Sequence, residues 1–329
     1  MAGPFTGHTA HIWSVAFSPD GHHILSRSDD QKICVWDSVT GEMVLGPFTG
    51  HADDISCKAF SPDGQHIVLC SHDQKVCVWD IMTGETVAGP FTGHTDLIHS
   101  VVFSPDGQYI VSWSHDQTVC VWNAKTGEKM AGQLTEHTDA MCVAFSPDGQ
   151  HIVLGSKDQT ICVWNVVTGE KVAGPFTGHT DYVNFVTFSP NGQHIVSGSK
   201  DHTICVWNAM TGEAVAGPFT GPTESVSYVA FSPDYQHIVS RSKDHTLYVW
   251  SAMTGETVGV FTGHTGTVWS AEFSPGGQHI VSGSADHTIR VWKVSPGGIV
   301  SGSFTEHINS VEPVAFSPDG QCIIHQNFD

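Results

Sequence analysis

The sequence predicts an all-β fold built from one four-stranded antiparallel unit that repeats along the chain. Three observations carry this prediction. Each repeat contains four short segments rich in β-branched and aromatic residues, separated by turns rich in Gly, Pro and Asp. No segment shows the 3.6-residue period of an amphipathic helix. A tryptophan recurs every 42 or 43 residues, which marks a repeat architecture; these residues are Trp36, Trp79, Trp122, Trp164, Trp207, Trp250 and Trp292.

The unit that follows His179 shows how each element is expected to form. Residues 183–188 alternate as a strand does, and residues 189–192, Ser-Pro-Asn-Gly, provide a tight turn. Residues 194–199 and 203–207 form the second and third strands, and residues 214–219 form the fourth. Four short antiparallel strands with no helix are typical of a β-propeller blade.

Four recurring features of the unit resemble the WD40 repeat family over essentially the whole chain. They are a Gly-His start, a serine in the second strand, an aspartate in the next turn and a terminal Trp-Asp-like dipeptide. The resemblance implies a buried hydrogen-bonded tetrad of His, Ser, Asp and Trp in each blade. The complete tetrads would be His8, Ser26, Asp30 and Trp36; His94, Ser112, Asp116 and Trp122; His179, Ser197, Asp201 and Trp207; and His264, Ser282, Asp286 and Trp292.

Three repeats break this tetrad. Leu69 and Leu154 replace the serine in the second and fourth repeats, and Pro222 replaces the histidine in the sixth. A leucine cannot accept the hydrogen bond that the serine would, and a proline carries no imidazole. We therefore expect these three blades to be individually weaker.

Serine, histidine and aspartate that converge in space also suggest a catalytic triad. The set recurs in blade after blade, however, and we expect it to be buried, where it satisfies polar groups that would otherwise be costly. No Gly-x4-Gly-Lys-Ser/Thr phosphate loop is present in the sequence. We expect no catalytic residues, no cofactor and no enzymatic activity.

The number of blades is the open question of the architecture. Seven full repeats cover residues 8–304, residues 2–6 match a fourth strand, and residues 307–329 match a partial repeat with strands at 311–316 and 322–326. The favoured arrangement has eight blades, in which these terminal strands form an incomplete composite closing blade and cover exposed sheet edges. The alternative has seven blades with displaced C-terminal strands. In both, residues 1–329 form a single propeller domain. We expect a monomer, or a dimer that pairs through the incomplete blade of the eight-bladed arrangement.

Composition limits the classes of partner. The net charge is −20, which argues against nucleic-acid binding because that needs Lys and Arg to displace counterions. No apolar run approaches the ~20 residues that cross a bilayer, so we expect no membrane partner. The nine cysteines show no Cys-x-x-Cys spacing, and five share one repeat position, too far apart in successive units for disulfides. We expect reduced thiols and a cytoplasmic protein.

The family resemblance implies that partners dock on the top face, at the third and fifth residues after the tetrad histidine and at the residue before the tetrad aspartate. These positions vary although the framework is nearly copied, and they include two tryptophans and three lysines, as protein-interface anchors do. The candidate partner-binding residues are His11, Trp13, Asp54, His72, His99, His115, Lys157, Tyr182, Lys200, Lys243 and Trp269. For the tryptophans, packing against neighbouring blades is the alternative, and for the lysines, a solvated rim.

The 22 histidines raise the question of a metal site. Most are spread over repeat positions, and only His72, His99 and His115 could gather on adjacent blades. Because three or four ligands must converge on one ion, we expect no metal.

The favoured function is a non-catalytic recognition or scaffold module that binds a protein or peptide on its top face. The Gly-Pro-Phe-Thr-Gly-His, Phe-Ser-Pro-Asp-Gly and Ile-Cys-Val-Trp segments resemble the C-terminal WD40 arrays of fungal NLR-like (NACHT-type) heterokaryon-incompatibility proteins. That resemblance implies a ligand-sensing module of innate-immunity type. The alternative is a soluble lectin that binds carbohydrate, whose sites should recur with the repeat.

Overall fold

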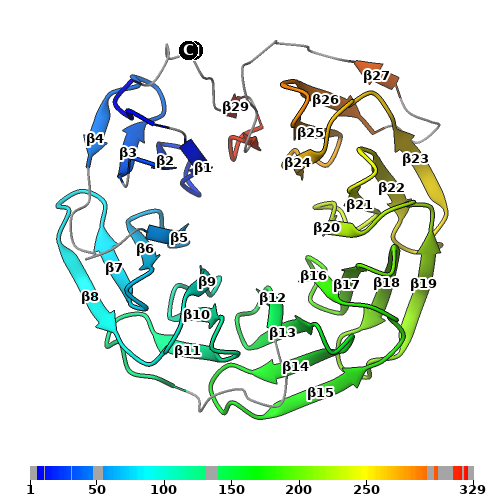
Figure 1. The fold of residues 1–329 in the computed structure, drawn as a ribbon, viewed down its shortest axis with the longest axis horizontal. Helices are drawn as coiled ribbons and strands as arrows, with labels where there is room; N and C mark the ends of the chain where they lie inside the picture. The colour runs from blue at the N-terminus through cyan, green and yellow to red at the C-terminus, as the bar shows by residue number, and fades with distance from the viewer. Residues whose placement is uncertain are drawn as a thin grey trace. The chain divides into compact units, whose positions relative to one another are not determined.

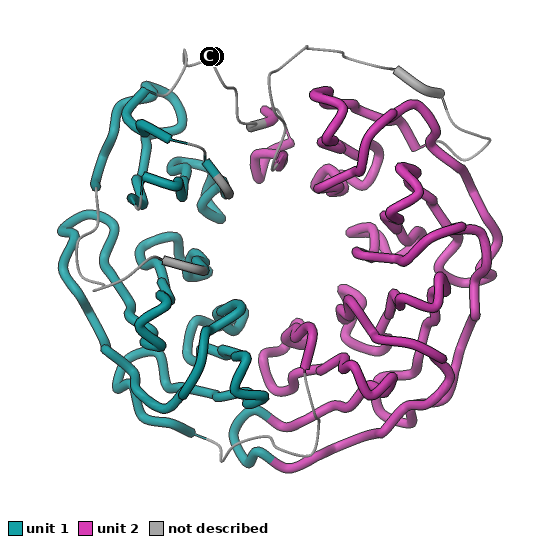
Figure 2. Tube along the Cα trace, in the orientation of Figure 1, with its two compact units in different colours: residues 1–139, 166–169 teal, residues 140–165, 170–329 magenta. Residues whose placement is uncertain are grey.

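The computed structural model describes residues 6–10, 12–30, 32–46, 55–130, 140–294, 300–302, 314–320 and 322–324, all of them outside any helix (Figure 1). These residues fall into two compact units (Figure 2). Unit 1 comprises residues 1–139 and 166–169, and unit 2 comprises residues 140–165 and 170–329. Within the described residues there is no helix of the length and apolarity that a membrane crossing requires.

Unit 1 contains three antiparallel sheets, one for each of the first three repeats. We call them blades 1 to 3; the third has three described strands. Their strands are β1 Ile12–Phe17, β2 His23–Ser28, β3 Ile33–Asp37 and β4 Met43–Leu45; β5 Ile55–Phe60, β6 His66–Ser71, β7 Val76–Asp80 and β8 Thr86–Phe91; β9 Ile98–Phe103, β10 Tyr109–Ser114 and β11 Val119–Asn123.

Unit 2 contains four four-stranded sheets, blades 4 to 7, and one two-stranded sheet. Its strands are β12 Ala140–Phe145, β13 His151–Ser156, β14 Ile161–Asn165 and β15 Lys171–Phe176; β16 Val183–Phe188, β17 His194–Ser199, β18 Thr203–Asn208 and β19 Ala214–Thr220; β20 Val226–Phe231, β21 His237–Ser242, β22 Leu247–Ser251 and β23 Thr257–Phe261; β24 Val268–Phe273, β25 His279–Ser284, β26 Ile289–Lys293 and β27 Val300–Gly302; β28 Ala315–Phe316 and β29 Ile323–Ile324.

The Ser-Pro-Asp-Gly turn between the first two strands of a blade is fixed by its own side chains. In blade 1, the Ser18 hydroxyl donates to Asp20 Oδ1 at 2.5 Å and accepts from the His23 N–H at 2.9 Å. Gly21 has φ +74°, a left-handed conformation that glycine adopts without strain. This turn sets the register of the hairpin, so that the second strand starts at the same point in every repeat.

The core lies in the second and third strands of each blade. In β17, five consecutive residues after His194 are buried, and in β18 four are. Neighbouring blades within a unit share apolar clusters: Val153 and Val163 of blade 4 pack with Val183 and Val186 of β16. The first strand of one blade therefore closes the core of the blade before it.

The structure shows seven blades and so corrects the eight-bladed expectation in favour of its alternative. The C-terminal strands β28 and β29 pair only with each other among the described strands. They pack on blade 7, where Val314, Phe316 and Ile323 contact a cluster with Val281 and Ile289. Each four-stranded blade joins its fourth strand to a third, and β29 is followed by no described third strand, so this hairpin is the displaced segment. Residues 2–5, 307–313 and 325–329 of the expected closing strands lie outside the described residues.

Cysteine pairing is a second correction. Cys57 of β5 and Cys70 of β6 lie opposite each other, with a Cα–Cα distance of 5.2 Å, and form a disulfide. We expected all thiols to be reduced because we compared only equivalent positions in successive repeats. This pair instead joins neighbouring strands of one blade. The free thiols include Cys142, whose pKa burial raises to about 12.

Candidate functional site

The four complete tetrads are hydrogen-bonded in the same way. In blade 5, the Trp207 indole N–H donates to Ser197 Oγ at 2.8 Å, and this hydroxyl lies 2.7 Å from His179 Nε2. His179 Nδ1 lies 3.0 Å from Asp201 Oδ2, and the Thr180 N–H donates to the same carboxylate at 2.8 Å. The chain of bonds ties the start of the first strand to the second and third strands.

The serine of this tetrad is placed for structure rather than for nucleophilic attack. Ser197 is fully buried and accepts the indole N–H of Trp207 while it contacts His179. Burial tends to raise the pKa of Asp201, but hydrogen bonds from His179, Thr203 and the Thr180 N–H outweigh it and lower that pKa below the usual range. The arrangement supplies an ionised, fully bonded carboxylate that stabilises the blade.

The tetrad of blade 1 repeats this geometry. Ser26 Oγ accepts the Trp36 indole N–H at 2.7 Å and lies 2.7 Å from His8 Nε2, and His8 Nδ1 lies 3.0 Å from Asp30 Oδ2. Ser26 is buried and lines neither of the two cavities described below. The structure therefore places Ser26 in the framework of the blade and not at a surface where a substrate or partner could reach it.

The tetrad of blade 7 is built in the same way. Ser282 Oγ accepts the Trp292 indole N–H at 2.8 Å and lies 2.8 Å from His264 Nε2, and His264 Nδ1 lies 2.9 Å from Asp286 Oδ2. Ser282 is fully buried and is likewise absent from the lining of both cavities. The serine, histidine and aspartate that suggested a catalytic triad thus have a structural role in this blade too.

The broken tetrads differ in how they are compensated. In blade 4, Leu154 occupies the serine position and the Trp164 indole N–H has no hydrogen-bond partner among the described residues. In blade 6, Tyr248 replaces the usual cysteine, stacks on Trp250 with ring centroids 5.5 Å apart, and donates its hydroxyl to the Gly221 carbonyl at 2.9 Å. Tyr248 thus bonds the segment from which the histidine is missing.

The antiparallel order of the strands places the predicted partner-binding residues at one end of each blade. They occupy the start of the first strand and the turn between the second and third strands. Among them, the structure brings together His99 with His115, whose rings are tilted by 38° with centroids 3.8 Å apart, and Tyr182 with Lys200. Trp269 is 47% exposed on β24. His11, Asp54 and the side chain of Trp13 lie outside what the structure describes.

The expected absence of a metal site concerns His72, His99 and His115. No group of three or more His, Cys, Asp or Glu side chains that could hold a metal ion exists in the part of the chain that the structure describes. The imidazoles of His99 and His115 face each other instead.

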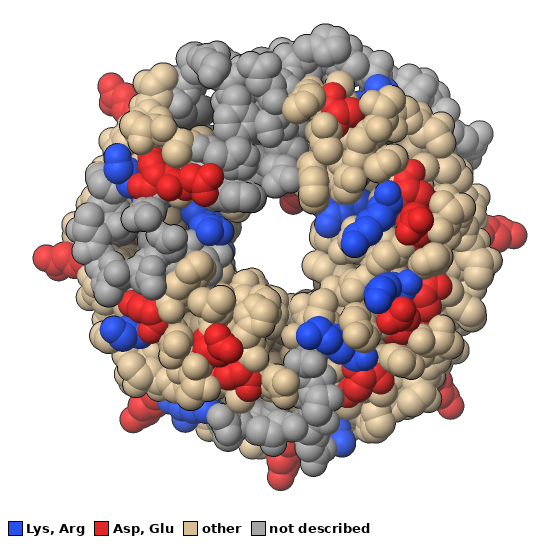
Figure 3. All heavy atoms as spheres, in the orientation of Figure 1, with Lys and Arg blue, Asp and Glu red and all other residues tan. Residues whose placement is uncertain are grey.

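Blades 5 and 6 of unit 2 form a cavity at this end. Its volume is about 510 Å³. We call its charged rim and the adjoining tyrosine the charged loop surface, which comprises Asp181, Tyr182, Lys200, Glu224 and Lys243. On the face shown in Figure 3, basic and acidic side chains lie side by side over blades 4 to 6. Lys157 lies half-buried in the corresponding turn of blade 4.

Lys200 is held in place from three directions. Its ammonium lies 4.7 Å from the centre of the Tyr182 ring and 3.8 Å from Asp181 Oδ2, and its backbone N–H donates to the Tyr182 carbonyl at 2.8 Å. Tyr182 remains 37% exposed. An aromatic face beside a positioned cation is a common recognition element in protein interfaces.

The floor of the cavity joins the two blades. The Asn184 amide donates to Ser225 Oγ at 3.0 Å and to the Val226 carbonyl at 2.9 Å. The next residue of β16, Phe185, has its ring 4.7 Å from that of Tyr228 in β20. Burial raises the pKa of Tyr228 to about 12, so its hydroxyl stays protonated. The charged loop surface therefore rests on a fixed floor.

Sequence reasoning missed the two acids of this surface. Asp181 precedes Tyr182, one of the candidate residues, and Glu224 occupies the equivalent position in the next repeat. In blade 5 the pair is in contact, since the Lys200 ammonium lies 3.8 Å from Asp181 Oδ2; in blade 6, Glu224 and Lys243 line the same cavity. Arg241 was also missed: its guanidinium lies 5.6 Å from the Tyr228 ring.

Comparisons with known proteins agree with this architecture. The chain matches the family model described as "WD domain, G-beta repeat" over residues 2–37, 43–80, 85–123, 128–165, 170–208, 214–251 and 255–293. A search of curated proteins finds no match. Among solved structures, the crystal structure of the computationally designed Ika8 protein is similar, with a TM-score of 0.80 and 27% sequence identity over 98% of each chain.

WD40 propellers generally serve as protein-interaction scaffolds, typically bind protein partners and are generally not enzymes. Seven matched repeats, seven blades and four hydrogen-bonded tetrads lead to one conclusion. The chain belongs to the WD40 family, with the all-β propeller fold of four-stranded antiparallel blades.

Proposed function

We propose that this protein is a recognition module that binds a peptide segment of a protein partner at the charged loop surface of blades 5 and 6. The observation that carries the proposal is the cavity of about 510 Å³ with Lys200, Lys243, Asp181 and Glu224 at its rim. No ion pair joins Lys243 to a described residue, and its side chain is exposed. An acidic side chain of the partner would pair with this ammonium, and Tyr182 would contact an adjacent apolar or cationic group.

The cellular role is part of the same proposal. The repeat resemblance supports a ligand-sensing module of innate-immunity type that works in the cytoplasm. We also propose that residues 1–329 act as one propeller domain, as a monomer or a dimer. Sedimentation at several concentrations distinguishes these two states.

A random-peptide phage display selection tests the proposal. Peptides are selected on the wild-type protein, and their affinity is then measured for the wild type and for Lys200→Glu/Lys243→Glu. We expect the selected peptides to be rich in acidic residues. We expect their affinity to fall steeply in the variant, because the charge reversal makes the rim repel them.

Lys293→Glu is the control for a charge reversal elsewhere on the surface, and it changes the net charge by half as much as the double variant. Lys293 is exposed at the end of β26, outside the charged loop surface, so this reversal should leave affinity within about twofold. Selected peptides that bind the double variant as tightly as the wild type would refute the site. Peptides that lose equal affinity in the control would show that only net charge matters.

The lectin alternative rests on the exposed indole of Trp269, which could stack on the apolar face of a sugar. Trp13 occupies the same position in the first repeat, but His99, Asn184 and Ser227 occupy it in others, so an aromatic does not recur with the repeat. The peptide proposal is therefore preferred. Binding on a glycan array that is lost in Trp269→Ala would reverse this preference.

A further inference from the structure

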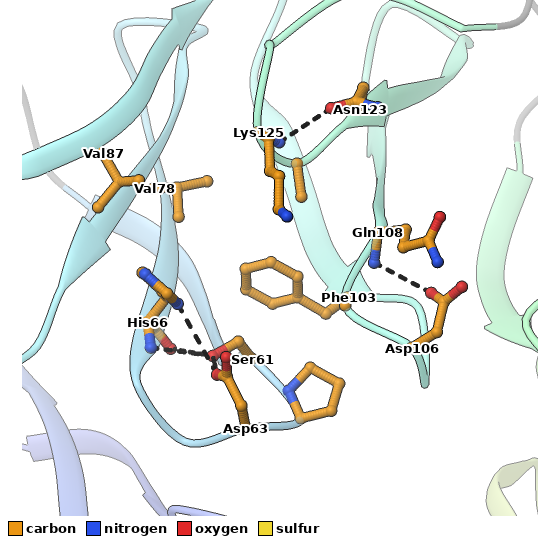
Figure 4. A pocket seen from close by; sticks show the side chains of 13 residues that line it. Ser61, Asp63, His66, Val78, Val87, Phe103, Asp106, Gln108, Asn123 and Lys125 are labelled. Carbon is orange, nitrogen blue, oxygen red and sulfur yellow. Dashed lines mark hydrogen bonds and ion pairs between the residues drawn. The ribbon is translucent and has the colours of Figure 1, made fainter.

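A second cavity lies at the other end of the strands, between blades 2 and 3 of unit 1. Its volume is about 750 Å³, within the range of small-molecule sites. Val78, Val87 and Phe103 form its apolar wall, and His66 and Lys125 stand at its edges (Figure 4). The turn between β9 and β10, which contains Gly107, completes the lining.

The charged side chains around this cavity differ in whether the protein itself already binds them. Asp63 Oδ1 accepts from the Ser61 hydroxyl and the Gln65 N–H. Asp106 Oδ1 accepts the equivalent two hydrogen bonds, from the Ser104 hydroxyl and the Gln108 N–H. The Lys125 side chain points into the cavity (Figure 4), and no ion pair joins it to a described residue. The equivalent residue is Met253 in blade 6 and Met210 in blade 5, so this cation is not part of the repeated framework.

The same place between blades 5 and 6 is already filled by an aromatic ring. Tyr235 stands in its turn where Gly107 stands in the turn of blade 3. Its ring stacks on His194 with centroids 5.5 Å apart and planes at 11°, and lies 5.2 Å from Phe231. The Tyr235 hydroxyl and His194 Nδ1 are hydrogen-bonded at 2.6 Å.

Each contact of Tyr235 has a counterpart in the cavity between blades 2 and 3. His66 corresponds to His194, and Phe103 corresponds to Phe231. His66 Nδ1 lies 3.7 Å from Asp63 Oδ1, beyond hydrogen-bond distance, so the imidazole can still bond a hydroxyl group. Glycine at position 107 leaves the space of the phenol ring unoccupied.

We propose that the cavity between blades 2 and 3 is a binding site for a phenolic ring that carries an anionic group. The ring lies between His66 and Phe103, as Tyr235 does between His194 and Phe231. The phenol hydroxyl hydrogen-bonds to the His66 imidazole. The anionic group pairs with the Lys125 ammonium, which blades 5 and 6 lack.

Titration followed by heteronuclear NMR tests this site with defined probes. The probes are 3-(4-hydroxyphenyl)propionate, 3-phenylpropionate without the hydroxyl, and tyramine with an amine in place of the carboxylate. We expect the first to bind saturably with shifts at Phe103 and Gly107. We expect the other two to bind more weakly, each by about tenfold.

Two variants make the test specific. Gly107→Tyr should abolish binding by placing a phenol ring in the cavity, and it should fold because Tyr235 adopts the same left-handed conformation, φ +61° against +70° for Gly107. A Cβ at Gly107 would meet only Pro62, at 3.5 Å. Lys125→Met should remove the preference for the carboxylate over tyramine while the phenol still binds.

Gly192→Tyr is the matched control, since it makes the same change in the turn of blade 5 and should leave binding between blades 2 and 3 intact. A capped Asp-Tyr dipeptide is titrated separately from the free acid. Saturable binding of the free acid or of the dipeptide that is lost in Gly107→Tyr supports the site. The probe that binds more tightly shows whether the natural ligand is a free phenolic acid or a tyrosine side chain. No saturable binding of either probe, or equal binding by Gly107→Tyr, would overturn it.

Discussion

Blade 3 and blade 5 have the same framework but different exposed residues. Both contain a complete tetrad with matching distances, such as 2.8 Å and 2.7 Å between histidine Nε2 and serine Oγ. Blade 3 carries His99 and His115 as a pair of imidazoles in contact, whereas blade 5 carries Asn184 and Lys200 at the same two positions. The repeat therefore determines the framework of the blade, and we propose that recognition depends on the positions where the repeats differ.

The largest expected effect is on binding by blades 5 and 6. Lys200→Glu/Lys243→Glu should weaken the selected peptides by about 100-fold, because two attractive contacts become repulsive. Isothermal titration calorimetry measures the loss. An equal loss in His99→Glu/His115→Glu would show that the comparison has assigned the site to the wrong blade.

The shared framework should respond equally in the two blades. Ser112→Ala and Ser197→Ala each remove the acceptor of a buried tryptophan N–H and a contact to histidine, which should cost about 2 kcal/mol of unfolding free energy. Denaturant unfolding of the two variants measures this cost. A large difference between the two variants would contradict a common framework.

Blade 6 extends the comparison because Pro222 replaces the tetrad histidine, and Tyr248 makes a hydrogen bond to the neighbouring Gly221 carbonyl. Tyr248→Phe should lower the unfolding free energy by about 1 kcal/mol, since the bond to the Gly221 carbonyl is lost while the stacking on Trp250 remains. Thermal unfolding checks the result. No change in stability would mean that Tyr248 does not compensate for Pro222.

Acid sensitivity should be a smaller effect and common to both blades. Hydrogen bonds outweigh burial and lower the pKa of Asp116 and of Asp201 in the folded state. Their stabilisation is therefore present above the unfolded pKa of ~3.9 and is lost as pH falls below it. Asp116→Asn and Asp201→Asn should each flatten stability between about pH 4 and 2. If the unfolding free energy of both variants depended on pH as steeply as that of the wild type, the lowered pKa values of Asp116 and Asp201 would be contradicted.

Local patterns were sufficient to predict the strands. Residues 183–188 and 194–199 were expected as strands and are the bounds of β16 and β17. The third and fourth strands extend one residue beyond expectation, to Asn208 and Thr220. Alternation and turn residues suffice here because each blade is a chain of short hairpins.

Contacts between strands and blades were beyond such patterns. The Cys57–Cys70 disulfide depends on the register of β5 against β6, and Tyr235 depends on how blade 6 packs against His194 of blade 5. The seven-bladed arrangement likewise depends on where the C-terminal hairpin packs. Each depends on which strands lie next to each other in the folded chain, and the period of the repeat does not predict that.

The most direct test of the account gives blade 5 the exposed residues of blade 3. The variant Tyr182→Leu/Asn184→His/Lys200→His copies Leu97, His99 and His115 into blade 5 and leaves its tetrad unchanged. Affinity for the selected peptides is measured beside the unfolding free energy. We predict that binding is lost, by about 30-fold or more, while the free energy of unfolding falls by no more than about 2 kcal/mol, the cost of the two Asn184 hydrogen bonds. Binding that survives this exchange would contradict the claim that recognition lies at these non-repeating positions.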